Sequence, residues 1–279
     1  MPEQHADLFY AALAGFGQCG VICRVTLKLI PAPKTVTAFR FAYPDAEALT
    51  AAQTVFLEQQ SFDHLEDWIL PGPQGWLHTI EAAVFHDQQN ASAAPPPAQV
   101  HCIEQKSLSY LEFLSRPGPT EHFPCLHSTP RHSHPWSVNF LPASSVTQFL
   151  QQQLDEEFSP AQMGPMGVIE VYPLRKSSIS APLVRLPEAD IVFLVAFFPC
   201  SLETDSERLQ HTVEMNYQRY IKARALGGSA DALIGAIHFN RDDWLAHYGQ
   251  HWGTFYRAKK TFDPSCLLVS PTAGMWTED

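Results

Sequence analysis

The sequence predicts an α+β fold in which helices cover a largely antiparallel sheet. The chain has 279 residues, of which 45% are hydrophobic and 17% are charged, so it can bury a substantial core. Segments with the period of a strand and segments with the period of a helix follow one another without strict strand–helix–strand alternation. Because that alternation is typical of parallel sheets, its absence favours an antiparallel sheet with helices on its face.

The first elements are a short helix, a glycine run and a strand. Apolar side chains recur at helical spacing after Asp7, which can cap the first turn. The run Gly15-x-Gly17-x-x-Gly20 follows this helix. Residues 21–29 then alternate apolar and polar side chains, which predicts a strand that the prolines after it bring to an end.

The remaining elements follow from periodicity and from turn residues. Alternating or continuously apolar runs predict strands at residues 35–43, 64–70, 76–85, 99–103, 136–141, 168–174, 191–198 and 232–239. Helical spacing of apolar side chains predicts helices at residues 45–59, 107–115, 144–157, 206–225 and 242–262. Two proline-rich stretches, residues 87–98 and 116–135, are predicted to be loops.

Charge and hydropathy exclude two classes of partner. The chain has 18 Lys and Arg residues against 29 Asp and Glu residues, and this formal charge of −11 repels a phosphate backbone, so no nucleic acid is expected. The longest apolar run, residues 191–198, is far shorter than the ~18 residues that a membrane helix needs, so no membrane partner is expected. Residues 1–7 contain no basic and apolar leader, which favours a soluble, cytoplasmic protein.

The glycine run matches the dinucleotide-binding fingerprint in its letters and not in its context. That fingerprint lies between a strand and the helix whose N-terminus points at the pyrophosphate. Here the helix precedes the glycines and the strand follows them, so a Rossmann site is not expected. The glycines can still permit close approach of the backbone to a flat or phosphorylated group, or they can serve a turn that needs positive φ.

Five metal-ligating side chains are close together in the second proline-rich stretch. They are His122, Cys125, His127, His132 and His134. Their spacings fit no standard zinc pattern, so the expected structure is a polar loop braced by prolines, with no metal.

Two neighbouring carboxylates interrupt a predicted strand. Glu66 and Asp67 lie between the apolar residues Leu65 and Trp68, so one of the two should point inward. An inward glutamate needs a partner or a raised pKa, which makes Glu66 a candidate site residue. The alternative is a structural carboxylate held in a salt bridge.

Three groups of segments together carry a family resemblance. They are Asp7-Leu-Phe-Tyr-Ala-Ala-Leu-Ala-Gly-Phe-Gly-Gln-Cys-Gly-Val-Ile-Cys-Arg24 with Pro31-Ala-Pro33, His134-Pro-Trp-Ser-Val-Asn-Phe-Leu-Pro142 with Gly164-Pro-Met-Gly-Val-Ile-Glu-Val-Tyr-Pro-Leu-Arg-Lys-Ser177, and His238-Phe-Asn-Arg-Asp-Asp-Trp244 with Leu267-Leu-Val-Ser-Pro271. In their order and spacing they resemble the C-terminal, substrate-binding part of cytokinin dehydrogenases, FAD-dependent enzymes of the vanillyl-alcohol oxidase superfamily.

The resemblance implies a division of the protein into three parts. Residues 1–33 would be the C-terminal remnant of an FAD-binding domain, and residues 34–237 would be the cytokinin-binding, or substrate-binding, domain. Residues 238–279 would form a C-terminal helix and a tail that returns to the flavin domain.

The resemblance also implies the cofactor contacts. The backbone of Gly17, Gly20, Val21 and Ile22 would contact FAD, and the turn at Ser270 would reach the flavin.

For the substrate, the resemblance gives one anchor and two departures. Glu66 matches the family glutamate that hydrogen-bonds the bound cytokinin, and we expect it to act in catalysis. Ile179 and Ile234 stand where members of the family have pocket aromatics. Because ring stacking adds ~0.5–1.5 kcal/mol per contact, these two replacements suggest that the substrate has changed.

The activity that the resemblance implies is oxidation of the C–N bond that joins the substituent of an N6-substituted adenine to its amine nitrogen. A hydride passes to FAD, and the imine hydrolyses to adenine and an aldehyde. No counterpart of the family's N-terminal flavin domain precedes Met1, so we expect most of the FAD contacts to lie in a separate flavin-domain chain or a missing domain. The alternatives are another FAD-linked amine or alcohol oxidase, and a non-catalytic truncated remnant.

Overall fold

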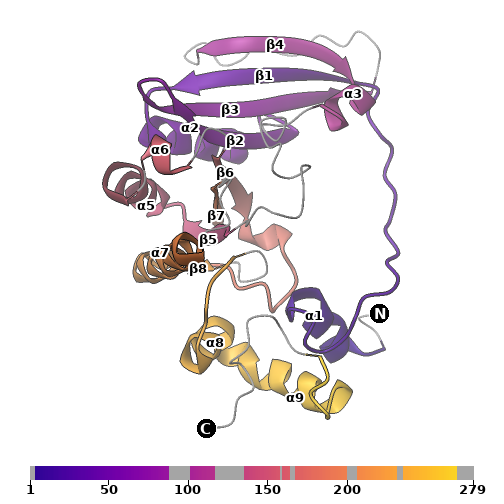
Figure 1. Cartoon of the computed structure of the whole chain (residues 1–279). Helices are drawn as coiled ribbons and strands as arrows, with labels where there is room; N and C mark the ends of the chain where they lie inside the picture. Colours follow the sequence, from indigo (N-terminus) through magenta and orange to yellow (C-terminus); the bar gives the residue numbers. More distant parts are fainter. Residues whose placement is uncertain are drawn as a thin grey trace.

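The computed structural model describes residues 4–87, 101–116, 135–157, 159–163, 167–199, 206–230 and 235–268. Their strands form one eight-stranded sheet in the order β4-β1-β3-β2-β6-β7-β5-β8, with antiparallel pairing between neighbours. Helices pack against this sheet, and a further group of helices lies below it (Figure 1). The predicted α+β class with an antiparallel sheet is therefore confirmed.

The bounds of the elements are as follows. The strands are β1 (Thr35–Tyr43), β2 (His64–Gly72), β3 (Gly75–His86), β4 (Cys102–Ser109), β5 (Ser137–Pro142), β6 (Val168–Arg175), β7 (Ile191–Phe198) and β8 (Ser229–Ala230). The helices are α1 (Ala6–Ala14), α2 (Ala46–Gln59), α3 (Tyr110–Leu114), α5 (Val146–Gln152), α6 (Pro160–Met163), α7 (Ser206–Ala225), α8 (Arg241–Tyr248) and α9 (Trp252–Phe262). Short π- or 3-10-helical turns follow α5, β6 and α8, at Gln153–Glu157, Lys176–Ser178 and Gly249–His251.

One face of the sheet is closed by helices α2, α5 and α7. Alternate strand residues on this face, among them Phe41, Ile69 and Val171, are fully buried in a core to which all three helices contribute. Helix α2 starts at Asp45, whose carboxylate accepts a hydrogen bond from the backbone N–H of Ala48 at 2.8 Å. We call this the helix face, and because it is a packed core, it offers no room for a ligand.

The opposite face is covered only in part, and we call it the open face. Over β5, β6 and β7 it packs against residues around Leu186, which join β6 to β7. Over β1 and β3 the short helix α3 covers one end, where Phe113 packs against Val36 and Ala83. A ligand site on this sheet must therefore lie on the open face.

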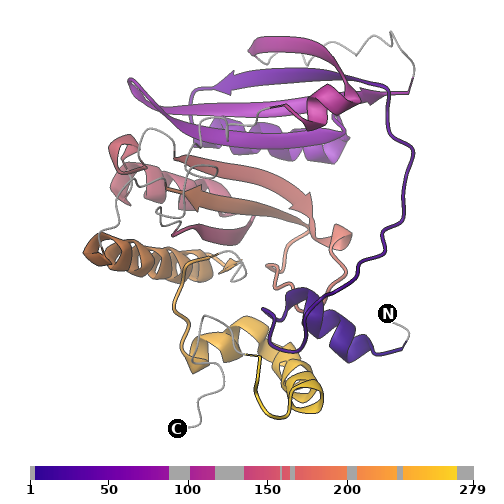
Figure 2. The same cartoon turned by 45° about the vertical axis from the view of Figure 1, so that its right-hand side comes forward.

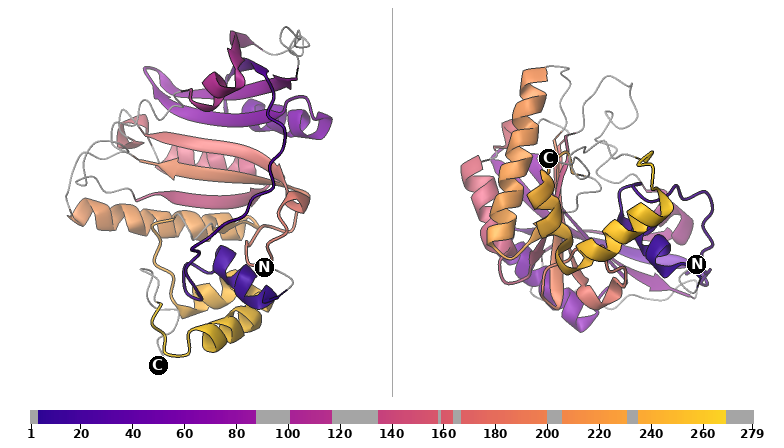
Figure 3. Two further views of the ribbon diagram at one scale, coloured as in Figure 1. Left: turned by 90° about the vertical axis from the view of Figure 1, so that its right-hand side faces the viewer. Right: turned by 90° about the horizontal axis from the view of Figure 1, so that it is seen from below.

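The two ends of the described part of the protein pack together below the sheet (Figures 1 and 3). Helices α1 and α9 share a buried cluster with α8. The hydroxyl of Tyr248 donates to the carbonyl of Ala14 at 3.1 Å, and the ammonium of Lys259 donates to the carbonyl of Gln18 at 2.8 Å. The three-part division at residues 33 and 237 stays a prediction, but its first and last parts meet here.

Residues 21–29 do not form the predicted strand, so that prediction is wrong. Residues 20–33 run from α1 to β1 as a single segment that pairs with no strand among the described residues (Figure 2). Its apolar side chains are largely exposed, for example Leu27 at 76% and Leu29 at 89%. Alternating side chains alone do not make a strand, because a strand also needs a hydrogen-bonding neighbour.

Four other predicted elements differ from the structure in their extent or in kind. The strand predicted at 99–103 runs over Cys102–Ser109, and the helix predicted from residue 107 begins at Tyr110, after an N-cap serine. The helix predicted at 242–262 divides into α8 and α9 at Gly249, whose φ of 49° breaks the helical backbone. Of the strand predicted at 232–239, the described residues 235–239 form no strand.

None of the described helices combines the length and the apolar character that a bilayer crossing demands.

Candidate functional site

A row of charged side chains crosses the open face over four strands. Antiparallel pairing places Arg40 of β1 opposite both Glu81 of β3 and Glu104 of β4, and it places Glu66 of β2 opposite Glu81. Residues directly opposite one another point to the same face of a sheet, so all four side chains share the open face. Arg40 forms ion pairs with Glu81 at 3.6 Å and with Glu104 at 3.5 Å.

Arg116 joins this row from above the sheet. Its Nε donates to Glu81 Oε1 at 2.6 Å, and one of its terminal nitrogens lies 3.6 Å from Glu66 Oε2. The guanidinium stacks over the ring of Phe113 at 3.8 Å, and it also donates to the carbonyl of that residue at 2.7 Å. Helix α3 therefore fixes the cation that neutralises two carboxylates facing one another across β2 and β3.

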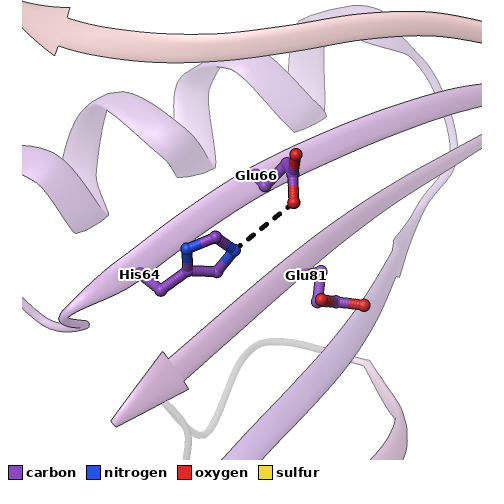
Figure 4. Close-up of side chains that lie close together, drawn as sticks. All are labelled: His64, Glu66 and Glu81. Atoms are coloured by element: carbon purple, nitrogen blue, oxygen red, sulfur yellow. Dashed lines mark ion pairs between the residues drawn. The ribbon is translucent and has the colours of Figure 1, made fainter. Parts of the chain in front are cut away.

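His64 completes the group around Glu66 (Figure 4). Its Nε2 lies 3.4 Å from Glu66 Oε2 and 3.2 Å from a terminal nitrogen of Arg116. A guanidinium can only donate, so the contact with Arg116 requires Nε2 to be unprotonated, whereas donation to Glu66 requires it to carry the proton. One nitrogen cannot do both at once, so the two contacts of His64 are alternatives.

The ligand atoms of His64, Glu66 and Glu81 are close enough to one another to hold a metal ion. However, Arg116 contacts all three side chains and already supplies the positive charge at their centre. A metal ion would have to displace this guanidinium, so the arrangement fits an ion-pair network better than a metal centre.

Glu170 of β6 is a second carboxyl group beside Glu66. It pairs with Trp68, two residues along β2 from Glu66, so both carboxyls point to the open face and lie diagonally across the two strands. Burial, together with the charge and the hydrogen bond of Glu66, raises the pKa of Glu170 to about 7. Burial alone would raise the pKa of Glu66 as well, but its contacts with His64, Arg116 and Glu170 hold it below its usual range.

The fully buried carboxylate of this strand is Asp67, not Glu66. The side chain of Glu66 is 25% exposed on the open face, whereas Asp67 is 0% exposed on the helix face. The expectation that Glu66 points into the protein is therefore wrong, because Asp67 is the residue that does so. Leu65 and Ile69 lie on the helix face with Asp67, whereas Trp68 lies on the open face with Glu66. Because both faces have apolar residues here, the sequence did not reveal which face the helices cover.

Burial raises the pKa of Asp67 well above its usual range. Neither of its carboxyl oxygens accepts a hydrogen bond from another described side chain that meets normal geometry, since the nearby amide of Gln53 donates to the carbonyl of Val171 at 2.8 Å. Burial thus favours the neutral form of this carboxyl group. It is a structural residue with no access to a ligand.

The residues predicted at the cofactor are only partly described. Gly17 has a φ of 69°, and a side chain added there would meet nothing within 4 Å, so its backbone is open to an approaching group. Gly20, Val21 and Ile22 continue into the exposed segment, where Val21 is 73% exposed. This accessible backbone fits a flat or phosphorylated group such as FAD. Ser270 lies outside the described residues.

Of the two predicted pocket positions, the structure describes only Ile179. Ile179 lies at the end of the turn after β6, is 41% exposed, and does not belong to the charged row. Ile234 lies outside the described residues, as do the five histidine and cysteine positions between His122 and His134.

Sequence reasoning missed four members of this site. Glu170 had a readable signal, because it is a carboxylate within the apolar run from Val168 to Val171 of β6. His64, Glu81 and Arg116 had none, because each looks like an ordinary surface residue until the strand register and α3 bring them together.

Comparison with known families matches residues 98–274 to the family described as cytokinin dehydrogenase 1, FAD and cytokinin binding. Among curated proteins, the chain is 27% identical over 310 residues to cytokinin dehydrogenase 9 of Oryza sativa subsp. japonica, covering 96% of this chain and 57% of that protein. It is also 27% identical over 272 residues to an uncharacterized oxidoreductase of the fasciation locus of Rhodococcoides fascians, covering 95% and 60%. The chain therefore spans less than two thirds of the length of these relatives.

Solved structures share the fold at low identity. A VAO-type flavoprotein of Myceliophthora thermophila C1 matches 99% of this chain and 53% of its own, with a TM-score of 0.67 and 14% identity. A xylooligosaccharide oxidase of the same organism, solved with xylobiose, matches 100% and 63%, with a TM-score of 0.66 and 14% identity. At such identity the likeness concerns the fold alone.

Proposed function

Because the chain belongs to the family described as cytokinin dehydrogenase 1, FAD and cytokinin binding, we propose that it supplies the substrate-binding part of an FAD-dependent oxidoreductase that acts on N6-substituted adenines. The observation that carries the proposal is the position of Glu66. It is an ionised carboxylate on the open face of the sheet, held by Arg116 and His64. The match to the family model confirms the recognition of the family from sequence, whereas the reaction of this protein remains our proposal.

Glu66 would bind the substrate by accepting a hydrogen bond from an N–H group. Its lowered pKa keeps it charged at physiological pH, and a charge-assisted hydrogen bond is worth ~1.5–3 kcal/mol. Arg116, which Glu81 holds in place, fixes the position of Glu66. A carboxylate held by a guanidinium does not need to reorganise when the ligand arrives.

FAD, when bound, would accept the hydride. The residues of this protein that would hold it are Gly17, Gly20, Val21 and Ile22, through backbone that is open to an approaching group. Gly17 lies just after α1 and the other three residues begin the exposed segment, residues 20–33, so together they could provide only a fraction of the contacts that a dinucleotide needs. We therefore propose that most FAD contacts come from a flavin domain outside this chain.

The exposed segment, residues 20–33, supports such a partner. It alternates apolar and polar side chains and pairs with no described strand, so its backbone N–H and C=O groups are available to a neighbouring strand. Without a partner it should promote self-association, since exposed apolar patches of more than a few hundred Å² rarely remain solvated. Replacing both Leu27 and Leu29 with Glu should then shift the protein toward monomer in light scattering.

The experiment that tests the proposal supplies the flavin domain of the Oryza sativa relative as a separate polypeptide. The mixture should become flavin-loaded and should convert N6-benzyladenine to adenine and benzaldehyde, and neither polypeptide alone should do so. If the complex forms and is yellow but leaves N6-benzyladenine intact while oxidising another amine or an alcohol, the substrate class is wrong. If no substrate is oxidised by a flavin-loaded complex, the protein is a non-catalytic remnant.

A further inference from the structure

Glu170 is unusual among the residues of its strand. The neighbouring side chains Val168, Ile169 and Val171 are buried and apolar, and across the sheet Glu170 faces Trp68 on β2 and Ala196 on β7. A carboxyl group in such surroundings is costly unless it has a partner. Glu66 lies on the same face, diagonally across β2 and β6 from Glu170, and burial together with the charge of Glu66 raises the pKa of Glu170.

Two neighbouring carboxyl groups that are partly shielded from water hold one proton more readily than two negative charges, because like charges repel strongly there. The neighbours decide which of the two carries the proton. Glu66 has the cation Arg116 at 3.6 Å and His64 at 3.4 Å, so it is the ionised member. Glu170 faces uncharged residues on both neighbouring strands, so it is the protonated member. The pair therefore presents an O–H donor beside a charged acceptor on the open face.

The other charged groups near the pair favour the same distribution. On the open face these are Glu81 of β3, which Arg116 and Arg40 neutralise, and behind the sheet there is Asp67. The negative charge of Glu66 disfavours ionisation of Glu170, and any negative charge on Asp67 would do the same. Among the described residues, no cation contacts Glu170 directly.

We propose that Glu66 and Glu170 together recognise a heteroaromatic ligand by one edge, on which an N–H group lies beside an unsubstituted ring nitrogen. Glu66 accepts from the ligand N–H, and Glu170 donates its proton to the ring nitrogen. The ligand thus forms two hydrogen bonds with the pair, and both polar groups on its edge are paired. This inference rests on the proposed function, because adenine bases with a free N9 offer such an edge at N3 and N9–H.

The pairing makes binding depend on pH. When Glu170 loses its proton, the donor disappears and a second negative charge faces Glu66. The pKa of Glu170, raised to about 7 by burial and by Glu66, places this loss in the neutral range. Affinity for a neutral purine should therefore fall as the pH rises through about 7.

The test measures binding of N6-benzyladenine to the 279-residue protein by ligand-observed NMR, at about pH 6 and about pH 8.5. We expect the wild-type Kd to increase at least about fivefold over this range, since one hydrogen bond of ~1 kcal/mol corresponds to that factor. Glu170→Gln keeps an N–H donor at both values, so its Kd should change less than about twofold. The 9-methyl derivative, which lacks the N–H, should bind the wild type about tenfold more weakly.

The matched control is Glu47→Gln. It removes one negative charge from an exposed position on α2, on the other side of the sheet, and it should keep the pH dependence of the wild type. A wild-type Kd that is independent of pH, or a Glu170→Gln variant that keeps the wild-type dependence, would overturn the inference.

A measurement without ligand separates this inference from the proposed function. Isotope-edited infrared spectra should show a protonated carboxyl group that titrates near neutral pH in the wild type and is absent from Glu170→Gln. If this carboxyl group is present but neither purine binds at either pH, the ligand class and the proposed function fail together. If N6-benzyladenine binds but no such carboxyl group titrates, the donor role of Glu170 fails and the proposed function stands.

Discussion

Adjacent carboxylates in β2 occupy opposite electrostatic environments, although they are chemically almost the same. Glu66 lies on the open face beside Arg116 and His64, which keep it ionised, whereas Asp67 lies on the helix face, where its carboxyl oxygens accept no hydrogen bond of normal geometry from a described residue. The alternation of a strand is sufficient to separate them, because a shift of one residue changes the face. The candidate site therefore depends on which face the helices cover.

Asp67→Asn should stabilise the protein at high pH and should have little effect at low pH. The pKa of Asp67 is raised in the folded state, so stability is lost as the pH rises from the unfolded value toward the folded one. An amide carries no charge and removes this dependence. Thermal melts at about pH 5 and about pH 9 should show a larger gain in Tm for the variant at the higher value. An equal loss of Tm at both values would mean that the carboxyl group has a partner that the amide cannot replace.

The sequence could predict Glu66 as a site residue, but only through the family resemblance and not through its burial. Two carboxylates between Leu65 and Trp68 indicated that one of them is buried, yet both flanking residues are apolar and do not distinguish the faces. The ion pairs of Arg116 could not be predicted, because they depend on contacts between residues 35 to 50 positions apart.

At the level of elements, α3 controls the site although it has only five residues. A capping box starts it: the Ser109 hydroxyl accepts from the backbone N–H of Glu112, and the Glu112 carboxylate accepts from the backbone N–H of Ser109. The helix then buries Phe113 and ends just before Arg116. A helix this short has little stability of its own, so its cap and its one buried ring hold the arginine over the sheet.

Ser109→Ala should loosen this helix without unfolding the sheet. Loss of an N-cap costs about 0.5–2 kcal/mol, which is small for the domain and large for a single helical turn. Hydrogen exchange should therefore become faster at residues 110–114, while the exchange of β1 and β3 stays as in the wild type. As Arg116 becomes less ordered, the pKa of Glu66 should rise. A variant with unchanged exchange in α3 would contradict the role assigned to the cap.

Helices and strands could be predicted where the local periodicity of the sequence agrees with how the element packs. They could not be predicted where a partner distant in sequence determines whether the element forms. The apolar runs at β6 and β7 predicted buried strands correctly, because these strands are covered on both faces. The alternation of residues 21–29 predicted a strand that no described neighbour completes. The long C-terminal helix was predicted as one element because Gly249 alone gives a weak signal for a break.

For the molecule as a whole, the link between the N-terminal and C-terminal helices is the feature that positions the glycine run. The Tyr248 hydroxyl, fully buried on α8, donates to the carbonyl of Ala14 at the end of α1, directly before Gly15. Gly15 itself lies against α9, since a side chain there would meet the ring of Phe255 at 2.7 Å. The segment proposed to contact FAD is thus held by helices more than 200 residues away in sequence.

Tyr248→Phe should release α1 while the sheet stays folded. The variant loses one buried hydrogen bond, worth ~1 kcal/mol, and leaves a carbonyl without its donor. Amide exchange in α1 should become about five- to tenfold faster, and exchange in β6 and β7 should not change. Tyr256→Phe is the matched control, because that side chain is 41% exposed on α9. Equal effects of the two variants would show that the link to Ala14 does not hold α1.

The most direct test of the proposed substrate site compares Glu66→Gln with Asp67→Asn in the complex reconstituted with a flavin domain. Glu66→Gln keeps the size and loses the charge, so kcat/KM for N6-benzyladenine should fall by roughly ten- to a hundredfold, at about 1.4 kcal/mol per decade. Asp67→Asn, on the helix face, should leave kcat/KM within about twofold of the wild type. If Asp67→Asn is the damaging change, or if both variants keep full activity with Tm intact, Glu66 is not the substrate anchor.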